Sequence, residues 1–254
     1  MGERRSTDKA PSLAVVADAP ADARMAQELA DRVLRDRSSW LGEQDELEPH
    51  RRWRGLHDHE THLEWHKLPE QARKMGIKAH GHFAGEPGAP DAVAARKALL
   101  LLMKASSPCP DGVILLRDSD GEWDRLKGLQ QARSAPDWPF KVVLGMAHPK
   151  RESWVLAGYV PSDATEQERL ESLKKSVGFD PIREAHTLKS NRRSSPDAKR
   201  DAKEILAQLT LENEDREASC WQKTPLAHLR EHGAQVGLTT FLEEVEAELL
   251  PLFG

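Results

Sequence analysis

Two aspartates at the end of a short apolar run have the clearest potential for chemistry in this sequence. Val113 to Leu116 are apolar, an Asp-Gly turn signal precedes them, and Asp118 and Asp120 follow. A run of this length between a turn and charged residues predicts a buried strand with both acids at its C-terminal end. Two carboxylates held there repel each other, and Mg²⁺ is suited to bind them because it prefers hard oxygen ligands. The alternative is a solvated loop whose acids precede a helix.

Acids also follow two other apolar runs. Asp18 and Asp22 come after the run at 13–17, and Glu152 comes after the run at 141–146. Parallel strands bring their carboxyl ends to one edge of a sheet, which is where open α/β sheets bind ligands. We therefore expect a site for Mg²⁺ (or Mn²⁺) and phosphate, with the metal ligands Asp18, Asp22, Asp118, Asp120 and Glu152. Each acid could instead serve only as a turn, cap or first-turn helix residue.

Basic residues occur in two places that suit phosphate binding. Lys150 and Arg151 directly precede Glu152 and could stabilise charge that builds up on a phosphate. Between Lys189 and Lys203 there are six basic residues and two acids, in a chain whose net charge is −5. Such a patch could neutralise backbone phosphates, although a solvated helix face is the alternative. The predicted nucleic-acid contacts are Arg151, Arg192, Arg193, Lys199, Arg200 and Lys203.

The elements that must position these residues alternate between strands and helices. Strands are predicted at 13–17, 77–83, 113–116 and 141–146, with helical patterns between them. This alternation is typical of βαβ crossovers and a mainly parallel sheet. The segment 38–75 is polar, rich in His and Trp and without a clear period, so we interpret it as an insertion.

From residue 161 onward the patterns are helical. Helices are predicted at about 164–176, 197–209, 224–232 and 238–250. We therefore expect an α/β domain at 12–160, with a mainly parallel four-stranded sheet flanked by helices, and a helical appendage at 161–254. The apolar stripe of the last helix could complete the core, or it could form an interface with a partner or a second copy of the chain.

Composition excludes several classes of protein. The 254 residues are 31% charged and 38% hydrophobic, which is typical of a globular chain rather than a membrane-spanning one. The first residues lack the apolar core of a signal peptide, and two distant cysteines fit a reducing compartment. We therefore expect a cytoplasmic protein without a membrane partner. The sequence contains neither of the Gly-rich phosphate-binding motifs Gly-x-x-x-x-Gly-Lys-Ser/Thr and Gly-x-Gly-x-x-Gly. Any ATP chemistry would therefore need another chain.

Two further groups of side chains are of interest. His62 and His66 are spaced as zinc ligands can be on a helix, although no third ligand is evident and a solvated insertion is the alternative. Trp123, Trp138 and Trp154 are expected to pack beneath the sheet edge as core residues.

The order of the acids resembles a known family. An acid after the first strand, Asp-x-Asp after the third and an acid near the fourth resemble the Toprim fold of topoisomerases, primases and nucleases of the overcoming-lysogenization-defect type. Two strings are similar to a group of small bacterial Toprim-like proteins: Arg117-Asp-Ser-Asp-Gly-Glu122 and Ala147-His-Pro-Lys-Arg-Glu-Ser-Trp-Val-Leu-Ala157. The resemblance covers about residues 12–158. It implies a Mg²⁺-dependent nuclease, a link with antiviral defence and an ATPase partner of the ABC type.

The resemblance also implies roles for individual residues. In Toprim proteins the first acid, usually Glu in a Glu-Gly turn, is a general acid/base, and the Asp pair holds Mg²⁺. Transferred to this chain, the general acid/base is Asp18. With Lys150 and Glu152 from the acidic edge, it completes the set of predicted catalytic residues. The chain departs from that pattern, because Asp replaces Glu at position 18 and Ala replaces Gly at position 19. An Asp side chain is one methylene shorter, which leaves open a catalytically weak regulatory or binding subunit of an ATPase-containing complex. A further alternative is a phosphatase with Asp118 as nucleophile and Asp120 as acid.

Overall fold

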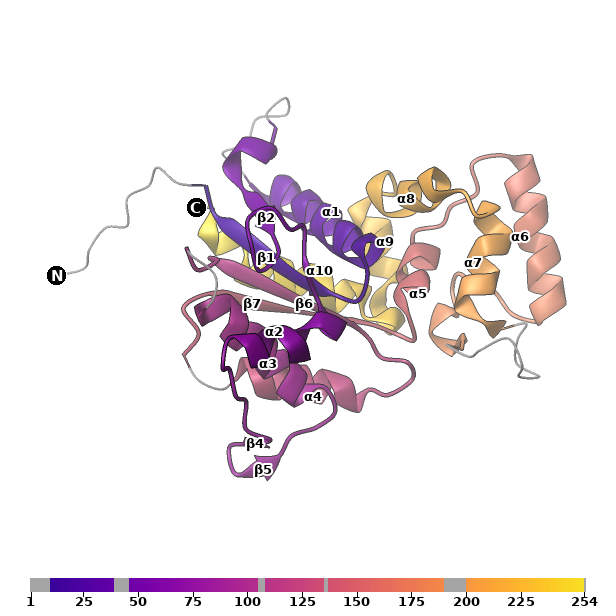
Figure 1. Cartoon of the computed structure of the whole chain (residues 1–254). Helices are drawn as coiled ribbons and strands as arrows, with labels where there is room; N and C mark the ends of the chain where they lie inside the picture. The colour runs from indigo at the N-terminus through magenta and orange to yellow at the C-terminus, as the bar shows by residue number, and fades with distance from the viewer. Residues whose placement is uncertain (1–9, 39–45, 105–107, 135–136, 190–199, 254) are drawn as a thin grey trace.

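Five strands form one parallel sheet at the centre of the protein (Figure 1). The computed structural model describes residues 10–38, 46–104, 108–134, 137–189 and 200–253. The strands are β1 Ser12–Ala17, β2 Arg52–Arg54, β3 Leu63–Glu64, β6 Gly112–Asp118 and β7 Lys141–Ala147. Their order is β2-β1-β6-β7, and β3 also pairs with β1. The prediction of an α/β fold with a mainly parallel sheet is therefore confirmed, whereas the predicted number of four strands is wrong, because the sheet has five.

The prediction of a strand of the central sheet at 77–83 is wrong. Within this range only β4, His82–Phe83, is extended, and it pairs antiparallel with β5, Glu86–Pro87, away from the central sheet. The missing sheet neighbours of β1 come instead from the segment interpreted as an insertion, which supplies β2 and β3. Their sequences are too short and too polar to produce an alternating apolar pattern. Pairing with the buried strand β1 therefore decides their conformation.

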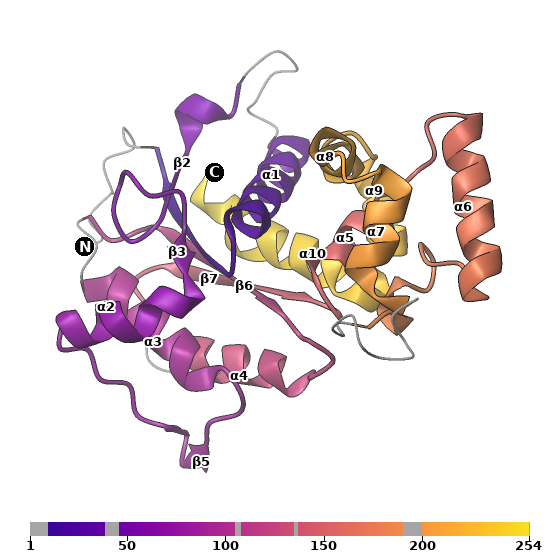
Figure 2. The same cartoon turned by 45° about the vertical axis from the view of Figure 1, so that its right-hand side comes forward.

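Helices cover both faces of the sheet (Figure 2). One face carries α1 Pro20–Arg37 and α10 Leu238–Glu248, and the other carries α2 Leu68–Lys74, α3 Ala92–Lys104 and α4 Asp124–Arg133. Strand alternation divides the buried side chains between these faces. Leu13 and Val15 of β1 belong to the cluster beneath α1 and α10, whereas Ala14 and Val16 belong to the cluster above α3.

The remaining α-helices lie beyond the carboxyl ends of the strands, on the right of Figure 1. They are α5 Arg151–Ala157, α6 Ala164–Val177, α7 Ala202–Thr210, α8 Glu214–Gln222 and α9 Leu226–His232. Of these, α8 was not predicted, and the first part of the helix predicted at 197–209 lies outside the described residues. The C-terminal part is thus helical, as predicted.

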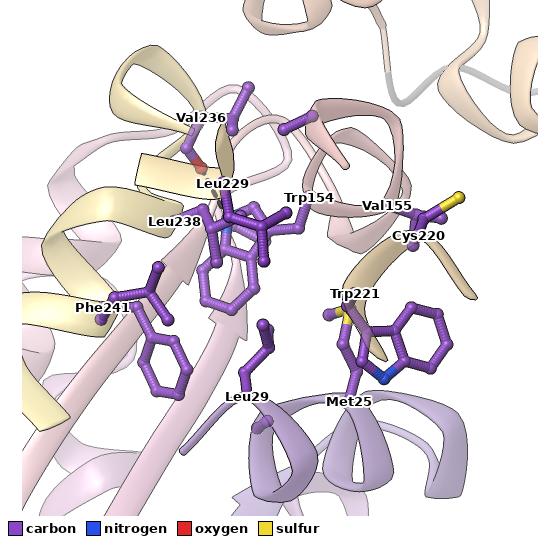
Figure 3. Packing of buried hydrophobic residues seen from close by; sticks show 14 of the residues in the cluster. Met25, Leu29, Trp154, Val155, Cys220, Trp221, Leu229, Val236, Leu238 and Phe241 are labelled. Atoms are coloured by element: carbon purple, nitrogen blue, oxygen red, sulfur yellow. Dashed lines mark hydrogen bonds between the residues drawn. The ribbon is translucent and has the colours of Figure 1, made fainter. Parts of the chain in front are cut away.

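This helical part shares its core with the sheet. The chain returns through α10, which packs against β7 and α1. Trp154 of α5 is 1% exposed, stacks on Phe241 of α10 with 5.0 Å between ring centroids, and donates its indole N–H to the Val236 carbonyl (Figure 3). Buried residues of the described part of 161–253 therefore complete one hydrophobic cluster together with β1 and α1. Within the described residues, no helix combines the length and apolar character that crossing a membrane requires.

Candidate functional site at the carboxyl edge of the sheet

Parallel strands bring acids from three separate segments to one edge. β1, β6 and β7 pair in parallel, so their C-terminal ends lie together. Asp18 follows β1, Asp118 is the last residue of β6, and Glu152 lies in the first turn of α5, directly after β7. Asp22 joins them from the first turn of α1. The structure therefore brings four of the five predicted acids to one place.

Asp118 is the most deeply placed acid of this group. Its pKa is raised from the ordinary value of 3.8 to about 8, first by burial and then by the negative charges of Asp22 and Glu152. The backbone N–H of Arg151 donates to Oδ1 of Asp118 at 2.9 Å, and this hydrogen bond offsets part of the rise in the pKa. The acids are thus close enough to disfavour one another's ionised forms.

Asp22 combines a local role with a place in the cluster. Its Oδ2 accepts a hydrogen bond from the backbone N–H of Ala19 at 3.1 Å, which caps the start of α1. Burial nevertheless raises its pKa to about 6, against the lowering effect of Arg151 and with contributions from Asp18 and Glu152. The capping role considered from the sequence is therefore present, and it does not remove Asp22 from the acidic group.

Two arginines lie among the carboxylates, and the sequence did not indicate how they would pair. Arg117 on β6 donates to Oδ1 of Asp18 at 2.5 Å and to Oδ2 of Asp91 at 3.1 Å. Arg151 approaches Oδ1 of Asp22 at 3.3 Å and Glu217 of α8 at 3.4 Å, and its side chain is 14% exposed. The described side chains around this small cleft leave no room between them for a water molecule.

Asp120 and Lys150 lie at the border of the cluster. Asp120 has a φ of 50°, is 41% exposed and approaches Arg125 at 3.3 Å. Its charge raises the pKa of Asp118 less than burial, Asp22 and Glu152 do. Lys150 is the residue at the N-cap of α5. Lys150 is therefore two residues before Glu152, at the start of the same helix.

The predicted basic contacts are only partly described. Arg192, Arg193 and Lys199 lie outside the described residues. Lys203 is exposed in the first turn of α7, and Arg200 is exposed just before that helix. Arg200 lies with Lys189 along a groove of about 460 Å³ that also borders Asp120 and His148. The groove connects part of the predicted basic patch with the acidic edge.

The donors at this edge fit Mg²⁺ in their chemistry and charge. Asp22, Asp118 and Glu152 offer hard carboxylate oxygens in a mutually repulsive group, which is an environment that a divalent cation would stabilise. Among the described residues, however, no group of three potential ligands has metal-binding geometry, and this holds for His62 and His66 as well. Cation binding would therefore require the carboxylates now paired with Arg117 and Arg151 to reorient.

The fold and the site together define a class: an α/β protein with a parallel sheet and an acidic cluster at its carboxyl edge. No family model matches the chain. No curated protein and no solved structure match it either.

Proposed function

We propose that the acidic edge binds a divalent cation and hydrolyses phosphodiester bonds, so that the protein is a metal-dependent nuclease of Toprim type. The observation that carries this proposal is the convergence of Asp118, Asp22 and Glu152 from three segments on one sheet edge. Perturbed acids that converge at such an edge are typical of a functional site. The resemblance of the two sequence strings supports the same assignment and a role in bacterial antiviral defence.

The residues of the site have distinct proposed roles. Asp118, Asp22 and Glu152 would hold Mg²⁺ (or Mn²⁺), with Asp18 and Asp120 at the border. When bound, such an ion polarises a phosphoryl oxygen and lowers the pKa of water. Asp18 would accept or deliver a proton once it is released from Arg117.

Cleavage assays on the full chain test this proposal. Supercoiled plasmid, single-stranded DNA and RNA would be incubated with Mg²⁺ or Mn²⁺, with EDTA as the metal-free reference. Asp118→Asn should abolish cleavage because it removes a charged ligand while keeping an oxygen acceptor for the Arg151 N–H. Asp137→Asn is the matched control, because Asp137 is exposed at the opposite end of β7. Equal cleavage by the wild type and Asp118→Asn rules the assignment out.

One observation favours a second function. Arg117 and Arg151 already neutralise part of the acidic group, and the cleft between the described side chains is too small for a water molecule. This arrangement suits a regulatory or binding subunit that keeps the fold without turnover, docked on an ATPase of the ABC type. The absence of Mg²⁺ binding in calorimetry, together with co-purification of an ATPase, would select this function over hydrolysis.

A further inference from the structure

A groove of about 460 Å³ lies directly beside the acidic edge. One wall comes from the loops that follow β6 and β7 and includes Asp120, His148 and Pro149. The opposite wall comes from the C-terminal helical part and includes His186, Lys189 and Arg200. Because the groove borders Asp120 at one side and two cations at the other, a molecule lying in it would extend towards the acidic cluster.

The two cations of the far wall are held side by side. The backbone N–H of Lys189 donates to the Arg200 carbonyl at 2.9 Å, and the Arg200 guanidinium lies 5.0 Å from the centre of the Phe179 ring. Both side chains are exposed. Exposed cations along a groove are suited to neutralise the phosphates of a polyanion.

An aromatic side chain lies against His148, one of the residues that line this groove. Trp123 is 46% exposed, which contradicts the prediction that it packs beneath the sheet edge. Its ring stacks on His148, with 4.5 Å between the ring centroids. His148 is itself positioned by a hydrogen bond of 2.7 Å between its Nδ1 and the Ser119 hydroxyl. Trp123 is therefore held in place from one side while much of its surface remains open to solvent.

We propose that this groove binds single-stranded nucleic acid, with Trp123 stacking on an unpaired base and with Lys189 and Arg200 contacting backbone phosphates. An aromatic platform beside a cationic groove is the arrangement that recognises single strands independently of sequence. A duplex offers its phosphates but keeps the faces of its bases stacked inside, so it cannot use Trp123. The inference deepens the proposed nuclease function and rests on it, because it names the form of the substrate that reaches the acidic edge.

Binding measured without metal tests the groove independently of catalysis. Fluorescence anisotropy in EDTA would compare a labelled oligothymidylate, an oligouridylate of the same length and a duplex. The wild type should bind both single strands more tightly than the duplex. Trp123→Ala should weaken single-strand binding by about thirtyfold, the middle of the range for removal of one base–aromatic stack. Trp123→Phe should keep most of the affinity. Met75→Ala is the matched control, because Met75 is 52% exposed at the end of α2, which lies on a face of the sheet.

The salt dependence of binding tests the phosphate contacts separately. Removing both cations, in the double variant Lys189→Ala with Arg200→Ala, should make single-strand binding less dependent on salt. The logarithmic slope should decrease by about 0.7 for each phosphate that the protein no longer neutralises. Arg73→Ala, at an exposed position of α2, should leave the slope unchanged.

The outcomes separate this inference from the proposed catalysis. Duplex binding as tight as single-strand binding, or wild-type affinity in Trp123→Ala, overturns the groove assignment whether or not the protein cleaves. Binding that follows the expected pattern supports the groove even when Asp118→Asn cleaves as fast as the wild type, a result that would end the nuclease assignment alone.

Discussion

Replacing Asp118 by Asn should change how the stability of the protein depends on pH. Asp118 has a folded-state pKa of about 8, against an ordinary value of 3.8, because it is buried beside other acids. The native state therefore retains a proton on this carboxyl group that the unfolded chain has already released. Asn carries no titrating proton, and its side-chain oxygen can still accept the hydrogen bond from the Arg151 N–H, which measures 2.9 Å in the wild type.

The direction and size of the effect follow from proton linkage. Stability falls with rising pH wherever the native state binds more protons than the unfolded state. For Asp118 this window runs from the ordinary pKa of 3.8 to the folded-state pKa of about 8. The free energy of unfolding should fall there by about 1.4 kcal/mol per pH unit, which is on the order of 4 kcal/mol by pH 7. Asp22, with a pKa of about 6, adds to the decrease in the lower part of the window.

Urea unfolding in EDTA, followed by tryptophan fluorescence at several pH values between about 5 and 8, measures this effect. Asp118→Asn should flatten the pH dependence and should be more stable than the wild type at pH 7 by several kcal/mol. Asp120→Asn is the control, because Asp120 is 41% exposed and its ion pair with Arg125 should contribute less than about 1 kcal/mol. An Asp118→Asn variant that keeps the wild-type slope, or that is less stable at pH 7, would refute the electrostatic account of the cluster.

Two other substitutions test an ion pair and a close backbone contact outside the acidic cluster. Arg216 pairs with both oxygens of Glu166, at 2.7 and 2.8 Å, and holds the pKa of Glu166 at about 2. Arg216→Ala should therefore cost about 3 kcal/mol near neutral pH, and in acid-unfolding curves its difference from the wild type should vanish as the pH falls towards 2. In Gly128→Ala the new Cβ would lie 1.8 Å from the Pro90 carbonyl oxygen, so the destabilisation from overpacking, about 2 kcal/mol or more, should exceed the helix-propensity gain of about 1 kcal/mol. Thermal unfolding should show a lower midpoint for this variant but not for Gly81→Ala, whose Cβ would meet only Val93 at 3.9 Å.

The strands that the sequence predicted correctly are those buried on both faces. β1, β6 and β7 are continuous apolar runs because helices cover both sides of the sheet. The edge strand β2 has the sequence Arg-Trp-Arg, and its buried Arg54 is satisfied by carbonyl oxygens of Leu56 and Pro108. No local pattern could predict such a strand, because its conformation depends on β1 and on a residue 54 positions away.

The candidate site, like the sheet, could be predicted only in part from the sequence. Acids that directly follow parallel strands must approach one another, so the positions of Asp118 and Glu152 could be predicted. The pairing of Arg117 with Asp91 and of Arg151 with Glu217 could not, because these partners are 26 and 66 residues apart. The solvent exposure of Trp123 was missed because an aromatic residue near a sheet edge is more often buried.

The sequence by itself determined the parallel α/β character of this protein and the edge at which its acids meet. Both depend on local apolar runs, on the order of strands and helices, and on the residues that directly follow each strand. Only the tertiary structure decided which arginine neutralises which acid, that α10 closes the core, and that Lys189 and Arg200 lie in a groove beside His148. These features depend on contacts between residues far apart in the chain, and the spacing of residues carries no signal for such contacts.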